Sequence, residues 1–137
     1  MDALYQKQIL EFAQHSRTKA FDRNAPLTAS CDNPVCGDRV DLSLAIDNGK
    51  ISTIGLTVRG CALCEAGAGF VLHALDGKTP ADAHALSDAF TAWITKETDQ
   101  PDDDNMAKFM PVRDIRNRHK CVLLAFQTAL KALDYKS

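Results

Sequence analysis

Apolar and polar residues alternate along the middle of the chain with the period of a β-strand. Every second position between residues 40 and 46 is apolar, and the alternation returns between residues 54 and 58, which is typical of two half-buried strands. Asn48 and Gly49 lie between the two runs. Both residues tolerate a positive φ angle, so this dipeptide predicts a tight antiparallel hairpin.

Apolar residues recur at helical spacing before and after this hairpin. This spacing predicts four helices, which are residues 2–15, a segment from Cys61 or Ala62 to Gly77, a segment after Thr79-Pro80, and a segment from Arg118 to Tyr135. The second of these helices is expected to bury one stripe, formed by Leu63, Ala66, Phe70, Val71 and Ala74. Residues 17–34 are mixed and polar, and they predict a loop with a short edge strand near Thr28–Cys31. A small antiparallel sheet with helices mostly after it is an α+β arrangement.

The composition favours an ordinary globular protein, and residues 1–137 are expected to form a single domain. A formal net charge of -2 gives no electrostatic argument for binding nucleic acid. No apolar run approaches the roughly 18 residues that span a bilayer, and the first residues lack the pattern of a signal peptide. We therefore expect no membrane association and a cytoplasmic location, where thiols stay reduced. Five cysteines then favour metal or sulfur chemistry over disulfides.

Cys36 lies between Pro34 and Gly37, which predicts a bent and exposed backbone at this thiol. Asp38 follows two residues later, and residues i and i+2 of an extended chain point to the same side. A thiolate and a carboxylate can therefore converge on one ion. A buried free cysteine in a turn that enters the strand is an equally good interpretation of the local sequence.

Cys61 and Cys121 both lie near the predicted start of a helix. The free N–H groups and the positive dipole end at such a start favour the thiolate at Cys61. Arg118 and Lys120 precede Cys121, and two cations are expected to lower the pKa of its thiol. The alternative for each cysteine is a small residue in the core.

Cys64 forms a C-x-x-C pair with Cys61 and lies one helical turn from it. A spare ligand, a sulfur relay and a core residue all remain open for Cys64, and a core residue is preferred. Cys31 has no motif around it and is interpreted as structural. The histidines on the predicted helices are isolated, with His119 the one nearest the candidate site. No cysteine has a recognisable His–Asp partner motif, so a stand-alone enzyme is not favoured.

Three sequence features together resemble a known family. They are Asn33-Pro34-Val35-Cys36-Gly37-Asp38, the pair Gly60-Cys61 and the helix that carries Cys121. This combination resembles the U-type iron–sulfur cluster assembly scaffolds (IscU, SufU and the amino-terminal domain of NifU). The resemblance implies a three-stranded antiparallel sheet packed with four to five helices. It also implies that Cys36, Asp38, Cys61 and Cys121 converge at one exposed end as ligands.

The resemblance further implies a function. A cysteine desulfurase would pass sulfur to Cys36, Cys61 or Cys121, iron would join, and a transient 2Fe–2S cluster would pass to recipient apo-proteins or a carrier. The aspartate would be the labile ligand.

The run Arg118-His119-Lys120-Cys121 is most similar to SufU-type members, which are associated with bound zinc. In that subtype Arg118 would occupy the place of a cysteine that leaves the zinc. Lys120 and Cys64 of this chain are also expected to lie beside the ligands, although Cys64 stands where the family has a small or apolar residue. A zinc-bound sulfur acceptor that activates the desulfurase without building a cluster is therefore the alternative function. A structural zinc adaptor is a third and less favoured function, because such sites are usually closed by four Cys or His ligands, whereas Asp38 would be a ligand here.

Overall fold

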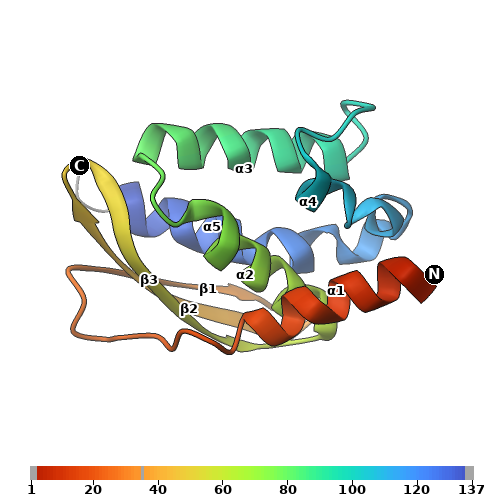
Figure 1. Ribbon diagram of the computed structural model, residues 1–137. Helices are drawn as coiled ribbons and strands as arrows, with labels where there is room; N and C mark the ends of the chain where they lie inside the picture. The colour runs from red at the N-terminus through yellow and green to blue at the C-terminus, as the bar shows by residue number, and fades with distance from the viewer. Residues whose placement is uncertain (1–2, 35, 135–137) are drawn as a thin grey trace.

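The computed structural model describes residues 3–34 and 36–134 (Figure 1). The chain begins with helix α1 (Ala3–His15), followed by strands β1 (Leu27–Asn33), β2 (Asp38–Asp47) and β3 (Lys50–Arg59). Two longer helices come next, α2 (Ala62–Leu75) and α3 (Pro80–Ile94). The last part contains α4 (Asp104–Ala107), the short 3-10 turns η1 (Met110–Asp114) and η2 (Arg116–Arg118), and α5 (His119–Asp134).

The three strands form an antiparallel sheet in the order β1-β2-β3. Asn48 and Gly49 have φ angles of 54° and 76° at the turn between β2 and β3, so the predicted hairpin is confirmed. Strand β1 is longer than the edge strand predicted near Thr28–Cys31, because it pairs with β2 along its whole length. Its side chains are mostly half-buried. They therefore lack the clean alternation that identifies a strand in a sequence.

The helices cover the sheet in layers. In Figure 1, α2 and α5 lie over the sheet and α3 lies on their far side. Five phenylalanines from different parts of the chain meet in the core, with neighbouring ring centroids 5.1–5.6 Å apart; they are Phe12, Phe70, Phe90, Phe109 and Phe126. The predicted α+β class with a three-stranded sheet and four to five helices is confirmed.

Helix α2 is buried on nearly all sides, and the single buried stripe predicted for it is wrong. Leu63 and Ala74 of that stripe are only half-buried, whereas residues outside the stripe, among them Cys64, are buried. A Cβ atom added at Gly69 would overlap the carbonyl oxygen of Phe12, and one at Gly67 would overlap the backbone of Val122. Helices α1 and α5 therefore approach α2 backbone to backbone.

Several helix boundaries match the sequence and others do not. Thr79 caps α3 by accepting a hydrogen bond from the Asp82 amide, as predicted. Gly77 follows α2 with a φ angle of 77°. The exposed acidic run Asp102–Asp104 supplies Asp103 as the N-cap of α4. The last helix begins at His119 rather than Arg118, which belongs to η2.

Two predicted helix ends, at Asp2 and Tyr135, lie outside the described residues. Within the described part of the chain, no helix has the length and apolar character needed to cross a membrane.

The glycine contacts of α2 lead to a stability prediction. Gly69→Ala should lower the free energy of unfolding by about 1–3 kcal/mol, because overpacking against the Phe12 backbone outweighs the gain in helix propensity. Urea denaturation measures the change. Ala85→Gly on the exposed face of α3 is the reference for helix propensity alone. A Gly69→Ala protein more stable than the unmodified chain would show that α1 and α2 do not pack this closely.

Candidate metal centre

Three potential ligand atoms from distant parts of the chain meet at one end of the sheet. The sulfurs of Cys36 and Cys121 and a carboxylate oxygen of Asp38 all lie within 4.8 Å of one another. The two sulfurs are 3.5 Å apart. Two thiolates bound to one tetrahedral zinc, at ~2.3 Å each, lie ~3.8 Å apart. The observed separation is therefore close to what a shared metal ion requires.

The turn that presents Cys36 is built by Asn33. Its carbonyl accepts hydrogen bonds from the amides of Cys36 (3.2 Å) and Gly37 (2.8 Å), and Gly37 has a φ angle of 74°. The Asn33 amide group also donates to the sulfur of Cys121 at 3.9 Å. Cys36 is exposed, as the flanking proline and glycine predict. Asn33 therefore connects the loop that carries Cys36 to the helix that carries Cys121.

Asp38 is the ligand candidate with the most unusual surroundings. Its residue is only 2% exposed. One carboxylate oxygen, Oδ1, accepts a hydrogen bond from the Cys61 amide at 3.3 Å. The other, Oδ2, is buried and has no hydrogen-bond partner among the described residues. A buried carboxylate oxygen without a partner is costly, and a cation bound between Asp38 and the two sulfurs would remove that cost. The residues present therefore fit a metal ion.

Cys61 lies beside this cluster. It is the N-cap of α2 with extended backbone angles (φ −73°, ψ 170°), and its side chain is half-buried. Its sulfur is not among the three mutually close ligand atoms. The structure thus brings together three of the four predicted ligands. The fourth, Cys61, lies next to them, because its backbone amide donates a hydrogen bond to Asp38.

Gly60 allows this close approach. A Cβ atom at Gly60 would lie 2.5 Å from Oδ1 of Asp38 and 3.1 Å from Cβ of Cys64. Only glycine fits here without displacing the carboxylate.

Burial decides the protonation of Cys121. Removal from water is the largest of the causes that raise the pKa of the Cys121 thiol. The neighbouring Asp38 and Cys36 raise this pKa further, whereas Arg118 lowers it. The prediction that two cations lower this pKa is therefore wrong, since Lys120 is exposed and desolvation outweighs Arg118. The residue is buried, in agreement with the alternative that Cys121 lies in the core.

Arg118 is the cation that reaches the site. Its Nη1 atom lies 4.0 Å from the sulfur of Cys36. Contact with Cys121, followed by the charge of Cys61, raises the pKa of Arg118. His119, expected nearest the site, instead has its ring Nε2 within hydrogen-bond distance of the carbonyls of Val112 and Arg113. The ring therefore joins η1 to α5.

Cys64 lies in the core, as preferred from the sequence, with no exposed surface. Burial, followed by the charges of Asp38 and Cys61, raises the pKa of its thiol to about 12. Cys31 is half-buried on β1 and opposite Val40.

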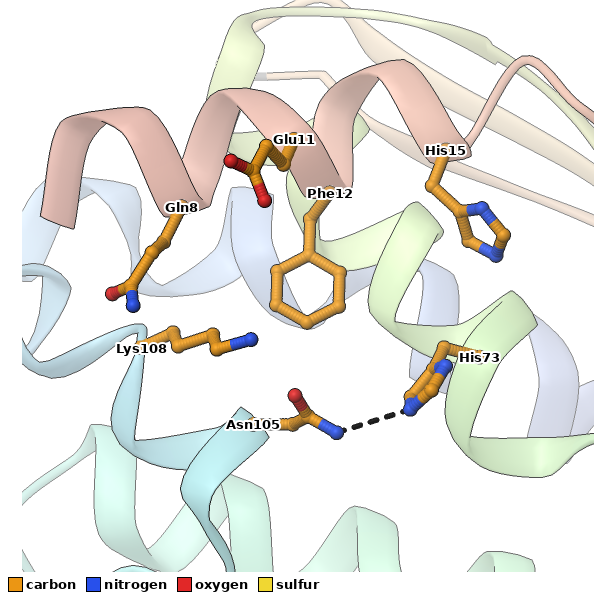
Figure 2. Close-up of a pocket in the computed structure, with 7 residues that line it drawn as sticks. All are labelled: Gln8, Glu11, Phe12, His15, His73, Asn105 and Lys108. Atoms are coloured by element: carbon orange, nitrogen blue, oxygen red, sulfur yellow. Dashed lines mark hydrogen bonds between the residues drawn. The ribbon is translucent and has the colours of Figure 1, made fainter. Parts of the chain in front are cut away.

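A hollow that the sequence did not indicate lies where α1, α2 and α4 meet (Figure 2). Its volume is about 210 Å³, and His15 and His73 line it with their ring centroids 6.5 Å apart. The Asn105 side chain lies 3.0 Å from Nε2 of His73. His73 and Cys61 are separated by most of α2, roughly 18 Å along the helix. This hollow is therefore separate from the cysteine cluster.

Comparison with known proteins gives consistent matches. The family described as "NifU-like N terminal domain" matches residues 4–132. A "Zinc-dependent sulfurtransferase SufU" of Bacillus subtilis (strain 168) is 26% identical over 135 residues, covering 97% of this chain and 91% of the relative. An "Iron-sulfur cluster assembly scaffold protein IscU" of Streptococcus pyogenes serotype M1 is 28% identical over 104 residues, covering 74% of this chain and 65% of the relative.

Solved structures share the same fold. The amino-terminal part of a NifU-like protein from Brucella abortus superposes with a TM-score of 0.83 at 26% identity, covering 95% of this chain and 92% of that one. A putative SUF-system scaffold protein from Fervidobacterium islandicum AW-1 gives a TM-score of 0.78 at 24% identity, covering 93% and 94% of the two chains.

The contact of Gly60 with Asp38 predicts the effect of a single methyl group. Gly60→Ala should weaken zinc binding by tenfold or more, since losing one well-made ligand contact costs at least ~1.4 kcal/mol. Competition with a colorimetric chelator measures the affinity. Gly49→Asn, at the far hairpin turn where an added Cβ meets nothing within 4 Å, should bind zinc normally. Equal affinities in the two variants would contradict the geometry at Gly60.

The raised pKa of Cys64 predicts alkaline sensitivity of the metal-free chain. The folded state holds the thiol proton more tightly than the unfolded state, so this contribution to stability is complete below the ordinary pKa of 9.0 and is lost as pH rises toward about 12. Urea midpoints at pH 7 and pH 10.5 measure the loss. Cys64→Ala removes the titrating group and should lose less stability over that interval. An equal loss in both proteins would assign the effect to other groups.

Proposed function

The chain belongs to the family of NifU-like N-terminal domains, and we propose that it is an iron–sulfur cluster assembly scaffold. In this role it accepts sulfur and transiently holds iron, zinc or a 2Fe–2S cluster before transfer. The observation that carries this proposal is the buried Oδ2 atom of Asp38, which has no hydrogen-bond partner within residues 3–34 and 36–134 and lies beside the sulfurs of Cys36 and Cys121. The names of the relatives, one a scaffold protein and one a zinc-dependent sulfurtransferase, support the same kind of chemistry.

The proposed ligands are Cys36, Asp38 and Cys121, with Cys61 as the fourth. Three thiolates and one carboxylate suit a tetrahedral zinc or an iron site. The hydrogen bond from the Cys61 backbone amide to Asp38 supports its inclusion. Asp38 is the ligand suited to exchange, because a carboxylate binds soft metals more weakly than a thiolate does.

A second candidate function is a zinc-bound sulfur acceptor that activates a desulfurase and builds no cluster. The contact between Arg118 and Cys36 favours it, since a guanidinium 4.0 Å from the sulfur can stabilise that thiolate when it is free of metal. A closed structural zinc site fits less well because Cys36 is exposed. In both favoured functions the supplying partner is a cysteine desulfurase, and Cys36 is the most accessible thiol for it. In the scaffold role, the receiving partner is an apo-protein or a carrier.

Metal and acid-labile sulfide analysis of the chain purified without oxygen tests the proposal. Iron with an equal amount of sulfide, before or after reconstitution, supports the scaffold. Zinc without sulfide, unchanged by reconstitution, supports the sulfur acceptor. A chain that binds none of these would contradict both functions.

Asp38→Ala is expected to retain a reconstituted cluster several-fold longer than the unmodified chain, because the exchangeable ligand is gone and thiolates remain. The visible absorbance of the cluster, followed during transfer to an apo-ferredoxin, measures retention. Asp32→Ala removes an exposed carboxylate on the neighbouring strand, where it pairs with Arg39, and is the matched control. Faster loss of the cluster from Asp38→Ala than from Asp32→Ala would show that Asp38 anchors the cluster.

A further inference from the structure

Cys64 is a buried thiol directly beneath a proposed ligand. Cys61 is the N-cap of α2 and Cys64 lies in the first turn of the same helix. Residues three apart in a helix have Cα atoms ~5 Å apart, which is inside the range that a disulfide spans. The two residues are therefore spaced so that their sulfurs can be joined without unfolding the helix.

The surroundings of Gly60 show independently where Cys64 packs. The Cβ of Cys64 and the Oδ1 of Asp38 both lie within 3.1 Å of the position that a Cβ on Gly60 would occupy. Cys64 has no exposed surface, whereas Cys61 is half-buried at the mouth of the site. Cys64 thus faces the site from the interior side.

We propose that Cys64 is the resolving thiol for a persulfide carried on Cys61. The inference rests on the proposed function, in which a site cysteine accepts sulfur. A persulfide on Cys61 has an inner sulfur, the Sγ atom, and an outer sulfur that came from the donor. Because Cys64 approaches from the interior, it reaches the inner sulfur, while the outer sulfur extends away toward the cluster of Cys36, Asp38 and Cys121.

The step balances without an external oxidant or reductant. The Cys64 sulfur attacks Sγ of Cys61, a Cys61–Cys64 disulfide forms, and the bond between the two persulfide sulfurs breaks. The outer sulfur leaves with that electron pair as hydrosulfide and takes up the proton from Cys64, giving one hydrogen sulfide. The outer sulfur is reduced from the sulfane to the sulfide level, and Cys61 and Cys64 are oxidised from thiol to disulfide level. A dithiol reductant then restores both thiols.

This chemistry delivers sulfur at the oxidation level that a cluster contains. Bridging sulfur in a 2Fe–2S cluster is sulfide, whereas a desulfurase supplies sulfane sulfur. Cys36 and Cys121 already face each other as ligand candidates, whereas the Cys61 sulfur lies outside that cluster. The C-x-x-C pair can therefore supply two electrons while the other two thiols stay available for metal.

The test uses the full chain with a low-molecular-weight persulfide, glutathione persulfide, as the sulfur donor, removed by rapid desalting. Trypsin releases residues 60–78 as one peptide that holds Cys61 and Cys64 and no other cysteine. Its mass after alkylation distinguishes a persulfide, which adds a sulfur, from the internal disulfide, which lacks two hydrogens. Released hydrogen sulfide is measured in parallel.

The unmodified chain should release hydrogen sulfide and accumulate the Cys61–Cys64 disulfide. In Cys64→Ala and Cys64→Ser the persulfide on Cys61 should persist at least ~10-fold longer, since a neighbouring thiol acts at an effective concentration far above that of free thiols. Two variants are used so that loss of one through misfolding leaves the other. Cys31→Ala, at a half-buried thiol on β1, should behave like the unmodified chain.

Equal persulfide lifetimes in the unmodified chain and both Cys64 variants, with no disulfide in the peptide, would overturn the inference. A pure packing role for Cys64 gives that result, and it leaves the proposed function intact. Absence of sulfane sulfur on Cys61 even in the Cys64 variants, where it would be trapped, also overturns the inference. Failure of the proposed function would be seen instead in the metal and sulfide analysis, as a chain that holds no metal or cluster.

Discussion

The backbone contact of α2 with its two neighbouring helices is the constraint on which the site depends. Gly67 and Gly69 allow α5 and α1 to approach without intervening side chains, and this fixes the position of the α2 N-terminus. That end carries Cys61, whose amide binds Asp38 at the start of β2. The first turn of α5 then brings Cys121 against Cys36. The candidate ligand atoms are thus positioned by helix packing that lies far from them.

The same packing gives the site its electrostatic character. A carboxylate and a thiol are removed from water next to each other, and one carboxylate oxygen has no partner in the part of the chain that the structure describes. Burial, followed by the neighbouring Asp38 and Cys36, raises the pKa of the Cys121 thiol, so in the absence of metal the thiol keeps its proton and avoids repulsion with the Asp38 carboxylate. A cation bound by both groups would relieve the same repulsion equally well, and the Cys121 thiol would then release its proton. Binding of a metal ion and protonation of the Cys121 thiol are therefore alternative ways to neutralise the same buried negative charge.

Local signals in the sequence were sufficient for much of the fold. The Asn48–Gly49 turn and the Thr79 cap depend on neighbouring residues only, and both agree with the structure. The extent of β1 and the all-round burial of α2 depend on partners distant in sequence, so periodicity could not reveal them. The spacing of Cys36 and Asp38 indicated that these two side chains can converge, whereas their convergence with Cys121 came from resemblance. The raised pKa of Cys121 depends on its burial in the fold, which the neighbouring residues in the sequence do not reveal.

The thiols at this end differ in burial, and burial sets what each can do. Cys36 is exposed, Cys61 is half-buried, and Cys121 and Cys64 are buried. A thiol must be accessible to receive sulfur from another protein, whereas a buried thiol is protected from reaction with solvent oxidants. A buried thiol reacts only with a group brought to it from within the chain, and for Cys64 that group is Cys61. Arranged this way, the chain can receive sulfur on thiols that reach solvent and keep the thiol that completes the electron supply in the core.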